Sequence, residues 1–217
     1  GPNGSGKTTL LNILAGDLKP DRGEITLLRG ETETDWLSLS RPQRASILAR
    51  VQQDPRQGTV ASMTVWDNLR LVSSRASFPS PFRFAPPTRD RSWFTERLKP
   101  LGLDSKINSR VADLSQGQRQ LLALELAMLR EPQFLLADEH TASLDQANAE
   151  TCLENTARLS RELSATVLMV THNPMNAITS GTHLLVLREG RVHRSLVGDD
   201  KNNVDLQELL KLCGYAI

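Results

Sequence analysis

The chain opens on Gly1-Pro2-Asn3-Gly4-Ser5-Gly6-Lys7-Thr8-Thr9, which fits the pattern GxxxxGK[ST]. Glycines in such a loop let backbone N–H groups face phosphate oxygens, and the helix that follows adds its positive N-terminus. Lys7 would reach the β and γ phosphates of a nucleotide, and the Thr8 hydroxyl would ligate Mg²⁺. The alternative is a glycine-rich turn that matches by chance. We expect a phosphate site made of Gly1, Asn3, Gly4, Ser5, Gly6, Lys7, Thr8 and Thr9.

The composition is that of an ordinary globular protein. The chain has 217 residues, of which 39% are hydrophobic and 24% charged, with 26 Lys+Arg against 25 Asp+Glu. These values argue against a disordered or collagen-like chain, and the balanced charge does not favour a nucleic-acid partner. No apolar stretch approaches the eighteen or so residues of a membrane-spanning helix. Cys152 and Cys213 lack the spacing of a zinc site or a disulfide framework, so a reducing cytoplasm is expected.

Hydrophobic periodicity predicts alternating strands and helices. Strands are expected at 24–28, 47–51, 134–137 and 166–170, with a β-hairpin at 184–196. Helices are expected from Lys7 to Gly16, at 65–72, 91–101 and 146–163, from Ser115 to before Pro132, and at 204–213. A strand, a helix and a strand in succession imply parallel pairing.

A single domain accommodates this order. We predict an α/β core with a mostly parallel sheet, formed by residues 1–53 and 131–217. A mostly helical lobe at 54–130 would interrupt the core, and the Pro/Arg-rich stretch at 73–91 would be an exposed insertion in that lobe.

Polar side chains follow three of the predicted strands: Gln53 after the second, Asp138 and Glu139 after the third, and His172 after the fourth. Parallel α/β sheets place ligands at this edge. Asp138 suits Mg²⁺ through water, and Glu139 can accept a proton from the water that attacks the γ-phosphate. Gln53 can coordinate Mg²⁺ or hold that water, and His172 can hydrogen-bond a γ-phosphate oxygen. The alternatives are ordinary polar loops and a structural histidine.

A second helix N-terminus has the features of an anion site. Ser115, Gln116, Gly117 and Gln118 combine a serine N-cap with a glycine ahead of a long apolar helix. The intervening lobe would hold this site away from the first one. A head-to-tail dimer would bring each serine helix over the partner's nucleotide. Taken alone, the motif would be interpreted as a simple capped helix.

These motifs and their order closely resemble the ATP-binding subunit of ABC transporters. Residues 1–8 match the Walker A motif, Gln53 the Q-loop, 114–118 the signature motif, 134–139 the Walker B motif, 142–145 the D-loop and His172 the H-loop. The resemblance implies a P-loop NTPase core of the ABC ATPase type that binds ATP and Mg²⁺. It also implies a dimer of identical or paralogous subunits that encloses two ATP molecules.

The resemblance assigns a role to each motif residue. Glu139, His172, Gln53 and Lys7 would be catalytic, and Thr8, Gln53 and Asp138 would hold the metal. Residues 115–118 would contact the γ-phosphate held by the partner, and Asp145 would communicate across the dimer.

The same resemblance implies a membrane permease as partner, touched by the Gln53 region and the helical lobe, and a peripheral location on the inner face of the cell membrane. The segments 51–58, 138–141 and 170–173 are similar to a little-characterised group of importer ATPases, which implies an extracytoplasmic substrate-binding protein. An ABC-type ATPase outside transport and a nucleotide-binding module without turnover remain as alternatives.

Three features depart from the family pattern. Gln116 stands where glycine is usual, and His140 stands where proline is commoner. The aromatic residue that stacks on adenine in this family precedes the phosphate loop, as does a β-strand, and the sequence begins at the loop. We interpret the chain as truncated at its N-terminus.

Overall fold

The computed structural model describes residues 1–76 and 89–214. Most of the predicted insertion at 73–91 therefore lies outside the described residues. The helices are α1 (Lys7–Ala15), α2 (Arg41–Ala45), α3 (Val65–Ala76), α4 (Arg91–Leu98), α5 (Gln116–Met128), α6 (Gln146–Leu163), α7 (Pro174–Thr179), α8 (Asp199–Asn203) and α9 (Leu206–Cys213). The strands are β1 (Thr26–Arg29), β2 (Thr32–Asp35), β3 (Leu48–Val51), β4 (Phe134–Asp138), β5 (Thr166–Val170), β6 (His183–Arg188) and β7 (Arg191–Val197).

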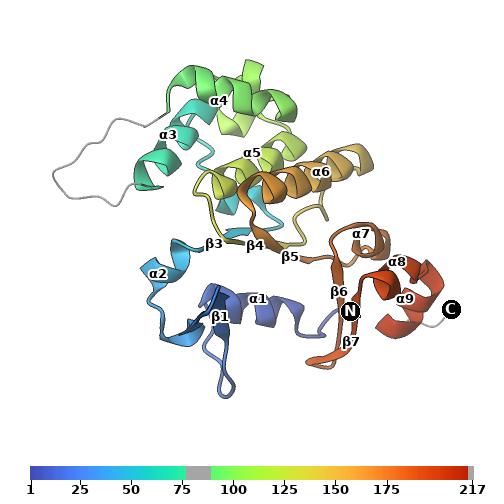
Figure 1. The fold of residues 1–217 in the computed structure, drawn as a ribbon. Coiled ribbons are helices and arrows are strands. Elements are labelled where there is room, and N and C mark those ends of the chain that lie inside the picture. The colour runs from blue at the N-terminus through green and yellow to red at the C-terminus, as the bar shows by residue number, and fades with distance from the viewer. Residues whose placement is uncertain (77–88, 215–217) are drawn as a thin grey trace.

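A parallel sheet of order β3-β4-β5 forms the centre of the fold. In β4, Leu135, Leu136 and Ala137 are all buried, as expected for a strand that is covered on both faces. Figure 1 shows α1 on one side of this sheet and α5 and α6 on the other. The predicted parallel pairing is confirmed, and it places the carboxyl ends of all three strands at one edge.

Capping residues set the limits of the helices that flank the site. The Asp145 side chain accepts from the Asn148 N–H at the start of α6, and Ser164 ends that helix in the left-handed region with φ 52°. Gly16, with φ 81°, ends α1 and donates to the carbonyls of Asn12 and Ile13. Both helices lie at the predicted positions.

Several elements differ from the predictions. The strand expected at 24–28 begins at Thr26 and pairs with β2, whose polar sequence shows no alternation. The helix expected at 65–72 continues to Ala76. The helix expected at 91–101 is α-helical only to Leu98 and continues as a 3-10 turn, because Pro100 lacks a backbone N–H. The closing helix begins at Leu206, after Asp205 as N-cap, and α8 precedes it.

The largest hydrophobic core joins α3, α4, α5 and α6 to the central sheet. Its completely buried members include Leu69, Phe94, Leu122, Leu135 and Leu159. A separate cluster packs the β6–β7 hairpin against α9. Among the described residues, no helix is both long enough and apolar enough to cross a membrane.

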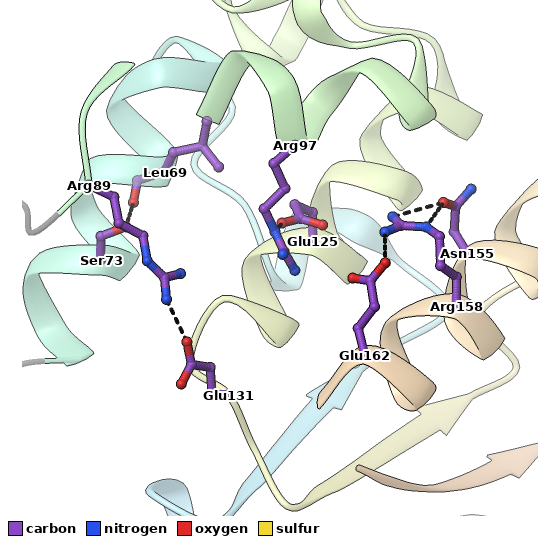
Figure 2. A network of polar contacts seen from close by, with 9 residues as sticks. All are labelled: Leu69, Ser73, Arg89, Arg97, Glu125, Glu131, Asn155, Arg158 and Glu162. Carbon is purple, nitrogen blue, oxygen red and sulfur yellow. Dashed lines mark hydrogen bonds and ion pairs between the residues drawn. The ribbon is translucent and has the colours of Figure 1, made fainter. Parts of the chain in front are cut away.

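A polar network lies within this helical region (Figure 2). The Glu125 side chain in α5 is completely buried and forms an ion pair with Arg97 of α4. In α6, Arg158 donates to Glu162 at 2.6 Å and also to Asn155. The packing of α4 against α5 therefore depends on this buried ion pair as well as on apolar contacts.

Candidate active site

The N-terminal loop has the backbone of a phosphate cradle. Gly4 and Gly6 have φ values of 74° and 97°, which favour glycine, and Gly6 is the N-cap of α1. Lys7 Nζ donates to the carbonyl oxygens of Gly1 and Pro2, both at 2.8 Å. The lysine thus lies across its own loop, and Thr8 and Thr9 form the first turn of α1.

The hairpin β6–β7 supports this loop from the side. The Gly190 N–H at the hairpin turn donates to the Ser5 carbonyl at 3.1 Å. A Cβ atom on Gly1 would lie 1.9 Å from the Leu187 carbonyl oxygen, so only glycine fits there. Ser5 is buried, and its hydroxyl has no hydrogen-bond partner among the described residues. The loop position is therefore fixed by tertiary packing as well as by its own glycines.

The strand ends bring the predicted polar residues together. Asp138 ends β4 opposite Val170 of β5, and the Glu139 N–H donates to the Val170 carbonyl at 3.0 Å. Glu139 adopts φ 47°. Its Oε2 lies 3.2 Å from Nδ1 of His172. Glu139 and His172 therefore meet at the sheet edge.

One cavity of about 710 Å³ is lined by five of the predicted site residues, whereas Lys7, His172 and Asp145 are not part of its lining. From the predicted set it is lined by Thr8, Gln53, Gln116, Asp138 and Glu139. Further lining comes from Gln52, Asp54, Pro55, Arg56, Gln57, Arg119 and Ser143. The cavity thus combines carboxylates, amides and a hydroxyl from four separate parts of the chain.

The oxygen donors on this cavity suit Mg²⁺. Thr8 offers a hydroxyl, Gln53 an amide carbonyl and Asp138 a carboxylate, all of which are hard ligands. Within 1–76 and 89–214, no group of three or more His, Cys, Asp or Glu side chains could hold a metal ion. In proteins, Mg²⁺ is usually bound by one or two carboxylates together with substrate phosphates and water.

Buried polar contacts anchor the segment that carries Gln53. The Gln120 side chain of α5 is completely buried and donates to the Gln52 carbonyl at 3.0 Å. On the other side of Gln53, Asp54 caps a 3-10 turn at Pro55–Gln57. Hydrogen bonds from the Arg56 side chain and backbone lower the pKa of Asp54. Gln53 is therefore held between two fixed neighbours.

The start of α5 is tied to the start of α6. Ser115 and Gln118 form a reciprocal capping box, with bonds of 3.0 and 3.2 Å. A Cβ atom on Gly117 would lie 2.7 Å from the Asn148 side chain, which donates to Asp145 Oδ2 at 2.6 Å. Hydrogen bonds from the backbone N–H and from the side chain of Asn148 lower the pKa of Asp145.

The start of α5 contributes to the same cavity, because Gln116 and Arg119 line it together with Thr8. Helix α5 reaches the cavity since it packs directly on β3 and on the 3-10 turn that follows Gln53. The expected separation of residues 115–118 from the phosphate loop of the same chain stays a prediction.

His140, next to Glu139, is buried as a neutral imidazole. Its Nε2 lies 3.2 Å from Thr156 Oγ1, and that hydroxyl donates to the Cys152 carbonyl. Because the hydroxyl proton is already used, Nε2 must be the donor. Nδ1 is buried without a partner among the described residues, and burial lowers the pKa of His140 to about 4.

This environment predicts acid sensitivity. A folded-state pKa below the unfolded value of about 6.5 means that the unfolded chain binds more protons between these values, so stability rises with pH in that window. From pH 7 to pH 5, His140 should cost about 2 kcal/mol of unfolding free energy. In urea unfolding, His140→Gln should therefore lose less unfolding free energy than the wild type between pH 7 and pH 5, by this amount. His183→Gln, at an exposed site, should lose as much as the wild type. An equal dependence of unfolding free energy on pH in the wild type and in His140→Gln would contradict a neutral buried imidazole.

Two polar side chains were missed from the sequence, one of them partly buried and the other completely buried. Arg50 interrupts the apolar run that forms β3, and Gln120 lies on the buried face of α5. A charged or amide residue inside an apolar pattern is the signal that marks both positions.

Comparisons with known proteins relate this chain to one family. The sequence profile of the family described as ABC transporter matches residues 1–142. The tyrosine transport ATP-binding protein of Clostridioides difficile is 38% identical over 220 residues, which cover 100% of this chain and 85% of that protein. The trehalose/maltose import ATP-binding protein MalK of Thermococcus litoralis is 32% identical over 190 residues, 88% of this chain and 49% of MalK. The structure of cbiO1 from Clostridium perfringens, part of the transporter complex cbiONQ, has a TM-score of 0.78 at 25% identity, over 97% of this chain and 79% of that one.

Proposed function

Since this chain belongs to the ABC transporter family, as one of its ATP-binding ATPase subunits, we propose that it hydrolyses ATP in the cavity between Thr8 and Glu139. The observation that carries this proposal is the convergence of Thr8, Gln53, Asp138 and Glu139 on one cavity. Thr8 follows the phosphate loop, Gln53 follows β3, and Asp138 and Glu139 lie together at the end of β4. A phosphate group there would meet a helix N-terminus, hydrogen-bonding side chains and a carboxylate base.

The nucleotide phosphates would lie along the glycine-rich loop. Backbone N–H groups of Gly1 and of residues 3–9 would bind the phosphate oxygens. Lys7 would exchange its bonds to the carbonyls of Gly1 and Pro2 for the β and γ phosphates. Thr8, Gln53 and Asp138 would hold Mg²⁺, which when bound offsets the negative charge of the phosphates.

Glu139 would act as the general base. It would take a proton from the attacking water as the water oxygen bonds to the γ-phosphorus and the bond to the β–γ bridging oxygen breaks. The products are ADP and phosphate. His172, 3.2 Å from Glu139, would orient this carboxylate and donate to a γ-phosphate oxygen. Gln53 would hold the attacking water.

The functional unit would be a dimer. Ser115, Gln116, Gly117 and Gln118 would contact the γ-phosphate held by the partner, and Asp145 would couple the two sites. The packing of Gly117 against Asn148, and of Asn148 against Asp145, supports movement of these motifs as one unit.

The subunit would power a separate membrane permease of an importer, with an extracytoplasmic substrate-binding protein. Relatives described as transport and import ATP-binding proteins support this assignment. The chain would lie on the cytoplasmic face of the membrane. We propose that residues 1–53 and 131–217 form the ATPase core and that 54–130 form the lobe that meets the permease.

Replacement of Lys7 with alanine tests the phosphate site. The variant should bind a fluorescent, non-hydrolysable ATP analogue about tenfold more weakly in the presence of Mg²⁺, because a charge-assisted hydrogen bond is lost. It should also lose MgATP-dependent phosphate release. Lys19→Ala, at an exposed lysine just beyond α1, should match the wild type in both assays. Unchanged affinity in Lys7→Ala would refute the phosphate role, and absence of phosphate release by the wild type would favour a module without turnover.

A further inference from the structure

Arg50 is a cation at the base of the proposed site. It pairs with Leu136 across the sheet, and its side chain is 16% exposed. Its guanidinium donates to Asp138 Oδ2 at 2.8 Å, to Asn12 Oδ1 at 2.9 Å and to Asp17 Oδ2 at 3.2 Å. One side chain therefore joins the end of β4 to the helix that follows the phosphate loop.

The bond to Asp138 is the better shielded of the two ion pairs. The Asp138 side chain is 15% exposed, whereas that of Asp17 is 63% exposed. Since water weakens the attraction between charges, Arg50 interacts more strongly with Asp138. Arg50 Nε is buried with no hydrogen-bond partner in the described part of the chain, so this placement leaves one donor unsatisfied.

The contact uses only one oxygen of Asp138. Arg50 occupies Oδ2, and no other hydrogen bond to this carboxylate forms within 1–76 and 89–214. Oδ1 is left for a further ligand. The guanidinium also places a positive charge within hydrogen-bond distance of the carboxylate, where it opposes the approach of a second cation.

We propose that Arg50 is a positioning residue that fixes Oδ2 of Asp138 and limits how strongly this carboxylate attracts the divalent cation of the nucleotide. The proposal rests on the proposed function, in which Asp138 faces Mg²⁺. Arg50 thereby makes metal binding depend on the phosphates that arrive with it, because the carboxylate charge is already partly neutralised. It also links the metal ligand to α1 through Asn12.

The test compares nucleotide affinity with and without metal. A fluorescent, non-hydrolysable ATP analogue is titrated into each variant in excess EDTA and in excess Mg²⁺. The Kd in EDTA divided by the Kd in Mg²⁺ measures how strongly the metal promotes nucleotide binding. Arg50→Gln should raise this ratio about tenfold, because a cation next to the metal ligand is removed. Arg50→Lys keeps the charge and should stay near the wild-type ratio. Arg29→Gln, which removes an exposed cation from β1, should leave the ratio unchanged.

The outcomes separate this proposal from the proposed function. If the wild type binds the analogue in neither condition, the proposed function fails. If the wild type binds and Arg50→Gln keeps the wild-type ratio, the Arg50 proposal alone fails. A rise of equal size in Arg50→Lys or in Arg29→Gln would also overturn it, because the charge at residue 50 would then not be the cause.

A second variant guards against misfolding of Arg50→Gln. Asp17 is exposed, so Asp17→Asn should fold normally, as circular dichroism can verify. In Asp17→Asn the positive charge of Arg50 is no longer partly neutralised by the Asp17 carboxylate, so it repels the metal ion more strongly. The Kd ratio should therefore fall about threefold. The same substitution in an Arg50→Lys background should lower it by a similar factor. An unchanged ratio in Asp17→Asn overturns the proposal.

Discussion

Replacement of Glu139 with glutamine is expected to reduce MgATP-dependent phosphate release by a factor on the order of 10² to 10⁴, the usual contribution of a general base. Glu139 lines the cavity and lies 3.2 Å from His172, so its carboxylate is placed to receive a proton. Glutamine has the same shape but cannot accept that proton at neutral pH. Binding of MgATP should persist, and the ATP-bound dimer should accumulate. Phosphate release and size-exclusion chromatography with MgATP measure the two effects.

Two controls make this result specific. Glu150→Gln removes an exposed carboxylate from α6 and should leave turnover unchanged. Ser115→Arg, added to Glu139→Gln, should abolish the ATP-dependent dimer while each monomer still binds nucleotide. Normal turnover in Glu139→Gln would exclude this residue as the base. A dimer that persists with Arg at 115 would count against contact of the signature residues with the partner's nucleotide.

Local sequence signals predicted most of the fold because they act within one turn or one strand. Helix α6 begins and ends where the sequence predicts, since Asp145 caps its start and an apolar stripe runs through it. Strand β4 was predicted from an unbroken apolar run. Strand β2 was missed because Thr32–Asp35 is entirely polar, and it is a strand only through its antiparallel pairing with β1.

The site was predictable where one rule covers many residues. The carboxyl ends of parallel strands share an edge, and this rule brought Glu139 and His172 together. The approach of Gln116 to the cavity was not predictable, because it depends on how α5 packs against β3. The tautomer of His140, which lies in a turn after β4, likewise depends on the Thr156 hydroxyl in α6. Hydrophobic periodicity does not indicate which distant segments of the chain come into contact.

Replacement of Arg97 with methionine is expected to lower the free energy of unfolding by about 3 kcal/mol at pH 7. Glu125 is completely buried, and Arg97 is its ion-pair partner (Figure 2). Burial raises the pKa of Glu125 even with this cation present. Without Arg97 the carboxyl must take up a proton to stay buried, which costs about 1.4 kcal/mol for each pH unit above its ordinary pKa.

The sign of the pH dependence identifies the cause. A carboxyl group whose pKa is raised in the folded state contributes most to stability at pH values below its pKa in the unfolded state. That contribution is lost as the pH rises. The loss in Arg97→Met should therefore be under about 1 kcal/mol near pH 5 and greatest at pH 7, as urea unfolding at several pH values can measure. Lys99→Met, which removes an exposed cation just after α4, should unfold at nearly the same urea concentration as the wild type. Arg97→Met combined with Glu125→Gln should lose the extra pH dependence. A penalty that is equal at pH 5 and pH 7 would instead assign the effect to lost packing of the Arg97 stem, and the buried charge of Glu125 would not be what Arg97 stabilises.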